Sequence, residues 1–360
     1  MSINASTVKN LDNETLAMLQ NGAITTILPW VYSFVAIISF PGNLFSLWLL
    51  CCRTKPKTPS VIFLINLSIT DLTLACVLPF QIVYHVRKNN WTFGKNLCNL
   101  VTVLFYTNLY SSILTITCIS IERYIGVVFP MAAPKWSKKR YAIATCLGIW
   151  VVLLIVLYPM ESTDLTFEVK SLNIVTCFDV LKWDMLPNVE SWAAFLITLF
   201  VFLFLIPFIV TVACYIGIIR ELVKTSAIYG NGQKRRSIKL AVLVLLVFVT
   251  CFAPNNFILL IHMVSRLFYH KSYYHFYKLS LTISCFSSCL DPFIYYFASK
   301  EFRKKFMQVL GRTTSFDGAE IRSGSYFSSR SSRSMTGSSG NGDGLPSRNK
   351  PLLKRQESVF

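Results

Sequence analysis

Seven blocks of apolar residues follow one another along the chain, and each is long enough to cross a membrane as a helix. The blocks cover 26–52, 61–86, 97–128, 141–160, 191–219, 238–264 and 276–298. A helix needs about 20 apolar residues to cross a hydrocarbon core of about 30 Å. Because lipid offers the backbone no hydrogen-bond partner, each block must satisfy its own backbone groups. The sequence therefore predicts an all-α membrane protein, a seven-transmembrane helix bundle at residues 26–298.

Charged residues are few and lie mostly between the apolar blocks. Only 14% of the 360 residues are charged, whereas a soluble domain carries about 25%, which argues against a large soluble helical protein. Thirteen Lys and Arg residues lie in the loops after the first, third and fifth blocks when Lys239, at the start of the sixth block, is included, and eight lie in the amino-terminal tail and the other loops. Cytoplasmic loops carry the excess of positive charge. We therefore predict a multi-pass plasma-membrane protein with its N-terminus extracellular and its C-terminus cytoplasmic. The net charge of +18 then faces anionic lipid and not nucleic acid.

Two tails flank the predicted bundle. Residues 1–25 are predicted to form an extracellular tail that is glycosylated at Asn4 and Asn13, because each begins an Asn-X-Ser/Thr sequon. Residues 299–310 place basic and apolar side chains at helical spacing, which predicts a short amphipathic eighth helix on the inner leaflet. No cysteine follows that helix, so palmitoylation of the tail is not expected. Residues 311–360 are rich in Ser, Gly and Arg and are predicted to be disordered.

The eleven cysteines divide into two groups by their place in the predicted topology. Nine fall inside the apolar blocks or at their inner ends, where small buried thiols are expected. Cys98, at the outer start of the third block, and Cys177, in the acidic loop 161–190, are the two on the oxidising side. No other partner is available to either, so we predict a Cys98–Cys177 disulfide across the mouth of the bundle.

Several polar residues lie deep inside the blocks, where they are costly and usually functional. Five of them combine carboxylates, hydroxyls and an amide: Asn43, Asp71, Ser112, Ser288 and Asp291. If these side chains converge, they form a wet pocket that suits a sodium ion, at Asp71 above all, or a shared proton. Hydrogen bonding between helices without any ion is the alternative.

Glu122 and Arg123 close the third block as adjacent opposite charges at its inner end. For an isolated pair of this kind, an anchor at the membrane interface is the main alternative to a functional role, because long side chains reach the interface from there.

Motifs spread over all seven blocks, and in a fixed order, carry a family resemblance. They are Gly42-Asn43, "NLSITDL", Cys98, "ERY", Trp150, Pro207 with Tyr215, "FVTCFAP" and "DPFIYY". From Gly42 to about Phe306 the chain resembles rhodopsin-like G protein-coupled receptors. "DP" in place of "NP" in the seventh block and "CFAP" in place of "CWxP" in the sixth are similar to the metabotropic purinoceptor branch. "ERY" departs from the commoner "DRY" and keeps its charge pattern.

The resemblance implies a switch and a set of cytoplasmic partners. Glu122 would hold Arg123 at rest and release it toward a heterotrimeric G protein and Tyr215, with Tyr295 turning inward. Phe248 would belong to the packing triad that relays the motion, Phe252 would be the rotamer switch, and Pro254 would supply the hinge of the sixth helix. Related lipid-sensing receptors favour the Rho-activating G protein class.

The carboxyl-terminal tail carries two further candidate partner motifs. A serine cluster is a candidate site for receptor kinases and arrestin, with a passive tether as the alternative: Ser328, Ser329, Ser331, Ser332 and Ser334. The last residues, Ser358-Val359-Phe360, fit a PDZ ligand, which needs a hydroxyl third from the end and an apolar final residue. Chance matches to so short a pattern are frequent.

The outer halves of the blocks suggest an extracellular small anionic ligand. Candidate residues combine a cationic rim with an aromatic and amide interior: Tyr84, Tyr106, Tyr110, Asn256, His262, Arg266 and Lys278. An amphipathic, lipid-like organic anion is favoured, because the stretch after Pro254 lacks the His and the Arg or Lys of nucleotide-binding relatives, and no cysteine remains for their second outer disulfide. A purine or pyrimidine nucleotide is the alternative. For each tyrosine alone, helix packing is the commoner role.

Two other classes of function lack support in the sequence. No internal repeat of the kind seen in transporters occurs. The four histidines are scattered, and no HExxH or GxSxG motif is present, so no nucleophile–base set or metal cluster indicates an enzyme.

Overall fold

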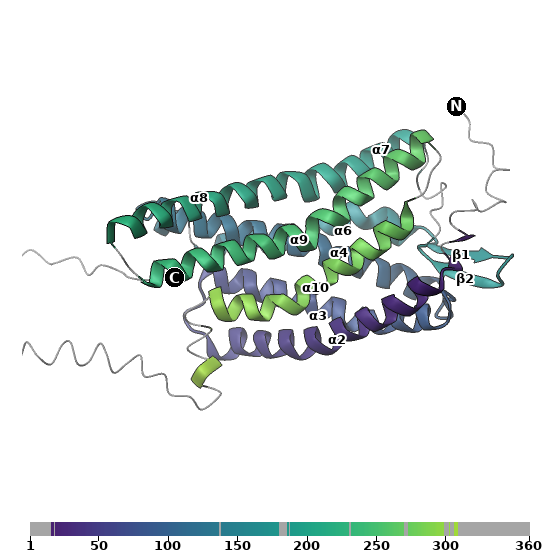
Figure 1. The fold of residues 1–360 in the computed structure, drawn as a ribbon, viewed down its shortest axis with the longest axis horizontal. Helices are drawn as coiled ribbons and strands as arrows, with labels where there is room; N and C mark the ends of the chain where they lie inside the picture. The colour runs from purple at the N-terminus through teal and green to yellow at the C-terminus, as the bar shows by residue number, and fades with distance from the viewer. Residues whose placement is uncertain are drawn as a thin grey trace, which may run out of the picture.

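In the computed structural model, long helices run side by side along one axis, and a small β-hairpin covers one end of them (Figure 1). The structure describes residues 16–17, 19–136, 138–179, 186, 188–229, 232–269, 273–298, 302 and 306–308. We call the end of the bundle with the β-hairpin and Cys98 the hairpin end. The opposite end, with residues 54–58 and 129–136, is the far end. The predicted all-α bundle is confirmed.

Seven long helical segments make up the bundle. Four of them are α2 (Gly22–Trp48) with the π-helical turn η2 (Leu49–Arg53), α3 (Pro59–Val86), α4 (Lys95–Val128) and α6 (Lys139–Ser162). The fifth is continuous through α7 (Val189–Ile197), the π-helical η4 (Thr198–Leu205) and α8 (Ile206–Tyr229). The last two are α9 (Gly232–Tyr269) and α10 (Tyr274–Ala298), and the short α5 (Ala133–Trp136) lies in a connection at the far end.

Six of these segments have the length and apolar composition of a membrane span among the described residues. They lie at Ile24–Arg53, Pro59–Val86, Lys95–Val128, Lys139–Ser162, Glu190–Thr225 and Ser237–Ser265. α10 is 25 residues long but is more polar, because it carries buried Lys278 and Asp291 and several buried serines. Polar residues in a span are tolerated when they face the interior of the bundle, and these do.

Helix ends and irregularities follow from local sequence. Thr58 caps α3 by accepting a hydrogen bond from the Val61 N–H, and Pro59 occupies the first helical position, where its missing N–H costs nothing. Pro207 has no N–H to offer the carbonyl four residues before it. The π-helical η4 ends just before it, and the Ile206 N–H donates to the Val201 carbonyl, five residues back.

The β-hairpin consists of β1 (Thr166–Val169) and β2 (Ile174–Cys177), which pair antiparallel with Thr166 opposite Cys177. The loop after α3 joins it, since the Trp91 N–H donates to the Val175 carbonyl over 2.7 Å. The predicted Cys98–Cys177 disulfide is present and connects β2 to the first turns of α4. The hairpin is therefore fixed over the end of the bundle from two sides.

A buried amide connects three helices at mid-bundle. Asn66 of α3 donates to the hydroxyl of Thr115 on α4 over 2.9 Å and accepts from the indole N–H of Trp150 on α6 over 2.9 Å. Asn66 also begins a sequon, but its side chain is 6% exposed. It therefore acts in helix packing, as its place inside an apolar block indicates.

The tail predictions fall mostly outside the described residues. This holds for the sequons at Asn4 and Asn13, for the serine cluster and for the terminal Ser358-Val359-Phe360. Within the predicted eighth helix, Phe302 and 306–308 are helical. Phe306 packs edge to face on Phe45 of α2, with ring centroids 5.7 Å apart. The start of the tail thus lies against the far end of the first helix.

Candidate functional site

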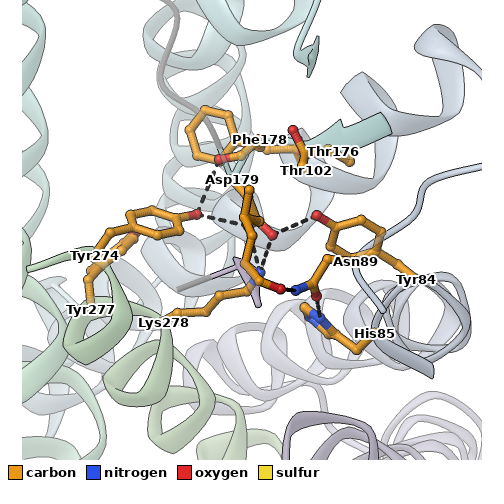
Figure 2. A network of polar contacts seen from close by, with 12 residues as sticks. Tyr84, His85, Asn89, Thr102, Thr176, Phe178, Asp179, Tyr274, Tyr277 and Lys278 are labelled. Carbon is orange, nitrogen blue, oxygen red and sulfur yellow. Dashed lines mark hydrogen bonds and ion pairs between the residues drawn. The ribbon is translucent and has the colours of Figure 1, made fainter. Parts of the chain in front are cut away.

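A buried ion pair between Lys278 of α10 and Asp179, two residues after Cys177, forms the centre of the hairpin end (Figure 2). The Lys278 ammonium lies 2.5 Å and 2.6 Å from the two carboxylate oxygens. Tyr84 of α3 donates to one of these oxygens over 2.6 Å, and Tyr274 of α10 donates to the other over 3.1 Å. Three donors from two helices therefore converge on one carboxylate.

The electrostatics of Asp179 follow from this arrangement. Burial alone would raise the pKa of the Asp179 carboxyl, but the ammonium of Lys278, helped by the hydrogen bonds from Lys278 and Tyr84, holds that pKa below its ordinary value. The carboxylate thus stays ionised at neutral pH, and the pair is lost only as the pH falls through the lowered pKa. Removing one partner of a buried ion pair costs about 3–5 kcal/mol, because the other charge is left unpaired.

Aromatic side chains surround the ion pair. The Lys278 ammonium lies 5.4 Å from the centroid of the Tyr84 ring. Tyr106 of α4 and Tyr277 of α10 share a hydrogen bond of 2.7 Å between their hydroxyls, and the ring of Phe178 meets Tyr106 edge to face at 5.6 Å. The site is therefore walled by aromatic rings, and the two tyrosine hydroxyls in this wall are paired with each other.

A second polar chain connects α3 to the first described segment of the protein. The Asn89 Oδ1 lies 2.7 Å from the Nδ1 of His85, and this amide oxygen accepts the hydrogen bond when that ring nitrogen carries the proton. The Asn89 amide N–H donates to the Leu19 carbonyl over 3.1 Å. Figure 2 shows His85 and Asn89 beside Tyr84. The amino-terminal segment is thereby held beside the Asp179 network.

The structure brings together some of the predicted ligand residues and separates others. Tyr84, Tyr106 and Lys278 gather at the ion pair, whereas the buried hydroxyl of Tyr110 has no hydrogen-bond partner among the described residues. His262 is buried, and its Nδ1 accepts from the Tyr273 N–H over 3.0 Å. That imidazole therefore joins α9 to the residue just before α10, and its contact with a ligand stays a prediction.

Two of the predicted ligand residues, Asn256 and Arg266, lie on α9. The Asn256 amide donates to the Phe252 carbonyl over 2.9 Å, and its buried oxygen has no partner among the described residues. That Asn256 contacts a ligand stays a prediction. Arg266 lies in α9, but its side chain is outside the described part of the chain.

The residues of the predicted sodium or proton pocket are buried together at mid-bundle. The Asn108 amide donates to Asp71 over 3.1 Å, and the Asn43 amide donates to the Ser288 carbonyl over 2.8 Å. Within the described residues, buried oxygens of several side chains have no partner: Asp71 Oδ2, Asp291 Oδ2, Ser112 Oγ, Ser68 Oγ and Tyr295 Oη.

Such orphaned oxygens indicate what the pocket can hold. Buried polar atoms are normally paired, and carboxylate and hydroxyl oxygens are ligands that hard cations prefer. Two neighbouring carboxyls also cannot both be ionised without a cation between them. Asp71, Asp291 and Ser112 therefore fit a sodium ion or a shared proton, which would neutralise the pair and hold α3, α4 and α10 together.

The far end contains the predicted switch residues. Glu122 of α4 accepts hydrogen bonds from the backbone N–H and the hydroxyl of Ser60 at 3.2 Å and 2.5 Å, which attaches α4 to the start of α3. Ser60 was not among the predicted residues, although it follows the cap of α3. That Glu122 also restrains Arg123 stays a prediction.

A cavity of about 30 Å³ brings most of the predicted switch residues into one place. Its lining includes Arg123, Tyr215, Phe248, Phe252, Asp291 and Tyr295. The cavity is large enough for a water molecule. It thus connects the end of the carboxyl pocket to Arg123, between α4 and α9.

Aromatic packing extends from this cavity along α9. Phe248 stacks on Phe208 with centroids 5.8 Å apart and contacts Phe252 at 5.4 Å. Pro254 lies within α9, two residues beyond Phe252. On the other side, the hydroxyls of Thr117 and Thr211 are 2.9 Å apart and join α4 to α8. A movement of α9 about Pro254 would therefore disturb a continuous row of rings.

Several residues of the hairpin-end site were not predicted from the sequence. They are Asp179, His85, Asn89, Phe178, Tyr274 and Tyr277. One available signal was the spacing on α10, where Tyr274 precedes Lys278 by four residues and therefore shares its face. Another was the position of Asp179 directly after the disulfide cysteine.

Comparison with known proteins identifies the class to which this architecture belongs. The family model of the 7 transmembrane receptor (rhodopsin family) matches residues 42–295. The chain therefore belongs to the rhodopsin family of G protein-coupled receptors.

Relatives within that family are similar over nearly the whole chain. Purinoceptor 8 of Gallus gallus is 65% identical over 357 residues, which cover 98% of this chain and 100% of the relative. The S-geranylgeranyl-glutathione receptor of Homo sapiens is 57% identical over 350 residues, or 97% of this chain and 98% of the relative. Human proteinase-activated receptor 2 is 37% identical over 304 residues, covering 84% and 76%. These relatives are receptors and not enzymes, and the family is one of multi-pass plasma-membrane proteins.

Proposed function

We propose that this receptor responds to an extracellular amphipathic organic anion of the S-geranylgeranyl-glutathione type and activates heterotrimeric G proteins of the Rho-activating class. The observation that carries the proposal is the carboxylate held by Lys278, Tyr84 and Tyr274 above a wall of aromatic rings. A site that binds one carboxylate with apolar surface beneath it matches a ligand with an anionic head and an apolar body.

The name of the human relative supports this ligand class. S-geranylgeranyl-glutathione joins a peptide with two carboxyl groups to a long apolar isoprenoid chain. Tyr106, Tyr277 and Phe178 offer the apolar faces, and the unpartnered oxygen of Asn256 offers an acceptor. At 57% identity over nearly the full chain, the two receptors are expected to share the class of ligand.

A nucleotide ligand is the second candidate, favoured by the name of the avian relative. A nucleoside triphosphate carries three to four negative charges, and it needs several cations. Lys278 is the only Lys or Arg with a buried side chain among the described residues, and it can balance a single negative charge. The electrostatics therefore favour a ligand with few charges.

The positive-inside pattern of the loops supports an orientation with the hairpin end outside the cell. The disulfide at that end agrees, since disulfides persist in oxidising space. In this orientation the far end, with Arg123 and Tyr215, faces the G protein. The proposed partners of the tail, namely receptor kinases, arrestin and a PDZ protein, would meet residues that lie outside the described part of the chain.

The ligand proposal is tested in cells that express the full chain, with G protein dissociation as the readout. S-geranylgeranyl-glutathione should activate the receptor, and adenine and uridine nucleotides should not. Lys278→Ala should raise the concentration for half-maximal response at least about tenfold, because a charge-assisted hydrogen bond is worth about 1.5–3 kcal/mol. Arg266→Ala is expected to act in the same direction.

Lys95→Ala is the matched control, because Lys95 begins α4 at the same end and its side chain is exposed. It should leave the potency unchanged. Activation by nucleotides but not by the lipid-like anion would contradict the proposed ligand class. Unchanged potency in both Lys278→Ala and Arg266→Ala would remove the anionic site.

A further inference from the structure

The carboxylate that Lys278 binds in this structure belongs to the receptor itself, at Asp179. Asp179 presents both of its oxygens to donors in the way a free carboxylate would, with Lys278 contacting both oxygens and a tyrosine hydroxyl on each. The donors come from α3 and α10, whereas Asp179 comes from the segment after β2 (Figure 2). The helices alone thus form a complete carboxylate site.

We propose that the carboxylate of the ligand enters this site by displacing Asp179, so that Asp179 is an internal competitor that holds the hairpin on α10 until the ligand arrives. The inference rests on the proposed anionic ligand and adds how that ligand binds. Tyr274 also donates to the Phe178 carbonyl over 3.1 Å, so exchange at Tyr274 and Lys278 releases the segment that carries Phe178 and Asp179.

Charge balance requires a one-for-one exchange. Lys278 is the only buried Lys or Arg in the described part of the chain, and one carboxylate neutralises it. A second carboxylate beside Asp179 would place two negative charges against one positive charge, which is unfavourable in a buried site. A ligand carboxylate that replaces Asp179 keeps the site neutral, while Asp179 moves into water.

The backbone next to Asp179 favours its release. Phe178 has a φ of 60°, in the left-handed region that bulky residues avoid. The segment is therefore held in an unfavourable conformation by the contacts of Asp179 and by the hydrogen bond from the Phe178 N–H to the Leu165 carbonyl. Loss of the ion pair lets this strain relax, which makes Asp179 a weaker occupant than an unstrained ligand carboxylate.

Insertion of a zwitterionic head between the two charges is the competing arrangement. There the ligand carboxylate would contact Lys278, and an ammonium would contact Asp179. Tyr84 and Tyr274, however, are positioned as donors to a single carboxylate. The donors therefore favour exchange, and the two arrangements predict opposite effects of removing the Asp179 charge.

The test compares S-geranylgeranyl-glutathione with its dimethyl ester on full-length receptor carrying Asp179→Asn. With the competitor removed, the acid should act at about tenfold lower concentration, whereas the ester should be little changed. Asp164→Asn is the matched control, since it removes the same charge from the same loop but at a carboxylate bonded locally to Thr166. Potency of the acid that falls or stays constant in Asp179→Asn would overturn the exchange.

Two further measurements keep the test decisive if Asp179→Asn reaches the surface poorly. The double variant Asp179→Asn with Lys278→Gln has no unpaired charge, and it should respond to acid and ester alike; a persistent preference for the acid overturns the proposal.

In the unmodified receptor, the acid but not the ester should speed hydrogen exchange of the backbone amides of residues 174–179. Slower or unchanged exchange there contradicts release of the segment. No response of the unmodified receptor to the acid would instead refute the proposed ligand.

Discussion

Arg123→Ala is expected to abolish G protein turnover while ligand binding is retained. Arg123 lines the cavity between α4 and α9 together with Tyr215 and Tyr295, and none of these residues lies near Asp179 and Lys278 at the hairpin end. Loss of each charge-assisted hydrogen bond in the active state costs about 1.5–3 kcal/mol, or roughly ten- to hundredfold in the population of that state. The measurement is nucleotide exchange on a purified G protein, paired with binding of the labelled ligand.

Arg53→Ala serves as the control for this prediction. Arg53 also lies at the far end, on η2, but its guanidinium lies over the ring of Trp48 at 5.6 Å and its side chain is exposed. It should leave turnover close to the unmodified level. Equal turnover in Arg123→Ala and the unmodified receptor would show that Arg123 is only an interfacial anchor.

Removal of the disulfide is expected to cause the second large effect, a loss of receptor stability together with ligand binding. The bond closes a separation of 79 residues, for which the chain-entropy model gives about 4–5 kcal/mol. It also fixes the end of β2, and with it the position of Phe178, whose ring forms part of the aromatic wall of the site. Cys98→Ser and Cys177→Ser should each lower the thermal midpoint of the purified receptor and remove binding of the labelled ligand.

Comparison of the single and double cysteine variants is an internal control for this prediction. Both single variants and the double variant lose the same single link, so their effects should be equal and not additive. Cys76→Ser, at an exposed cysteine without a disulfide, should change neither quantity. Full stability and binding in Cys177→Ser would contradict a structural role for the hairpin. Asp179→Asn differs from these variants, because it keeps the Cys98–Cys177 disulfide and should raise potency.

The parts of the fold that depend on local pattern could be predicted from the sequence. Apolar blocks of membrane length fix the helices, because only helices satisfy the backbone in lipid. Costly polar residues such as Asp71 and Asp291 mark the interior of the bundle for the same reason. The pairing of Cys98 with Cys177 could be predicted from the side of the membrane on which each cysteine lies. Every other cysteine lies within an apolar block or at its inner end, so these two alone are on the oxidising side.

The hairpin-end site depends on contacts that local pattern does not contain. Lys278 was predicted to be a ligand cation, but its partner Asp179 lies 99 residues away in a loop with five other carboxylates. No periodicity distinguishes one acid from the rest in such a loop. His262 was likewise predicted to lie at a cationic rim, and only the fold shows that the Tyr273 N–H engages its ring. The hydrogen bond that Glu122 accepts from Ser60 of α3 was likewise not predictable, because Ser60 comes from another helix.

In the proposed mechanism, binding at the hairpin end moves the far end of α9 away from α4. Double electron–electron resonance tests this motion directly. The two spin labels are attached to cysteines that replace Met131, just past α4, and Lys239 on α9, both of which are exposed. Cys51, Cys52 and Cys76, which are exposed, are first replaced by serine. We predict that S-geranylgeranyl-glutathione with the G protein shifts the distances to longer values. One unchanged distribution in the presence and absence of both would contradict the motion and the switch built on it.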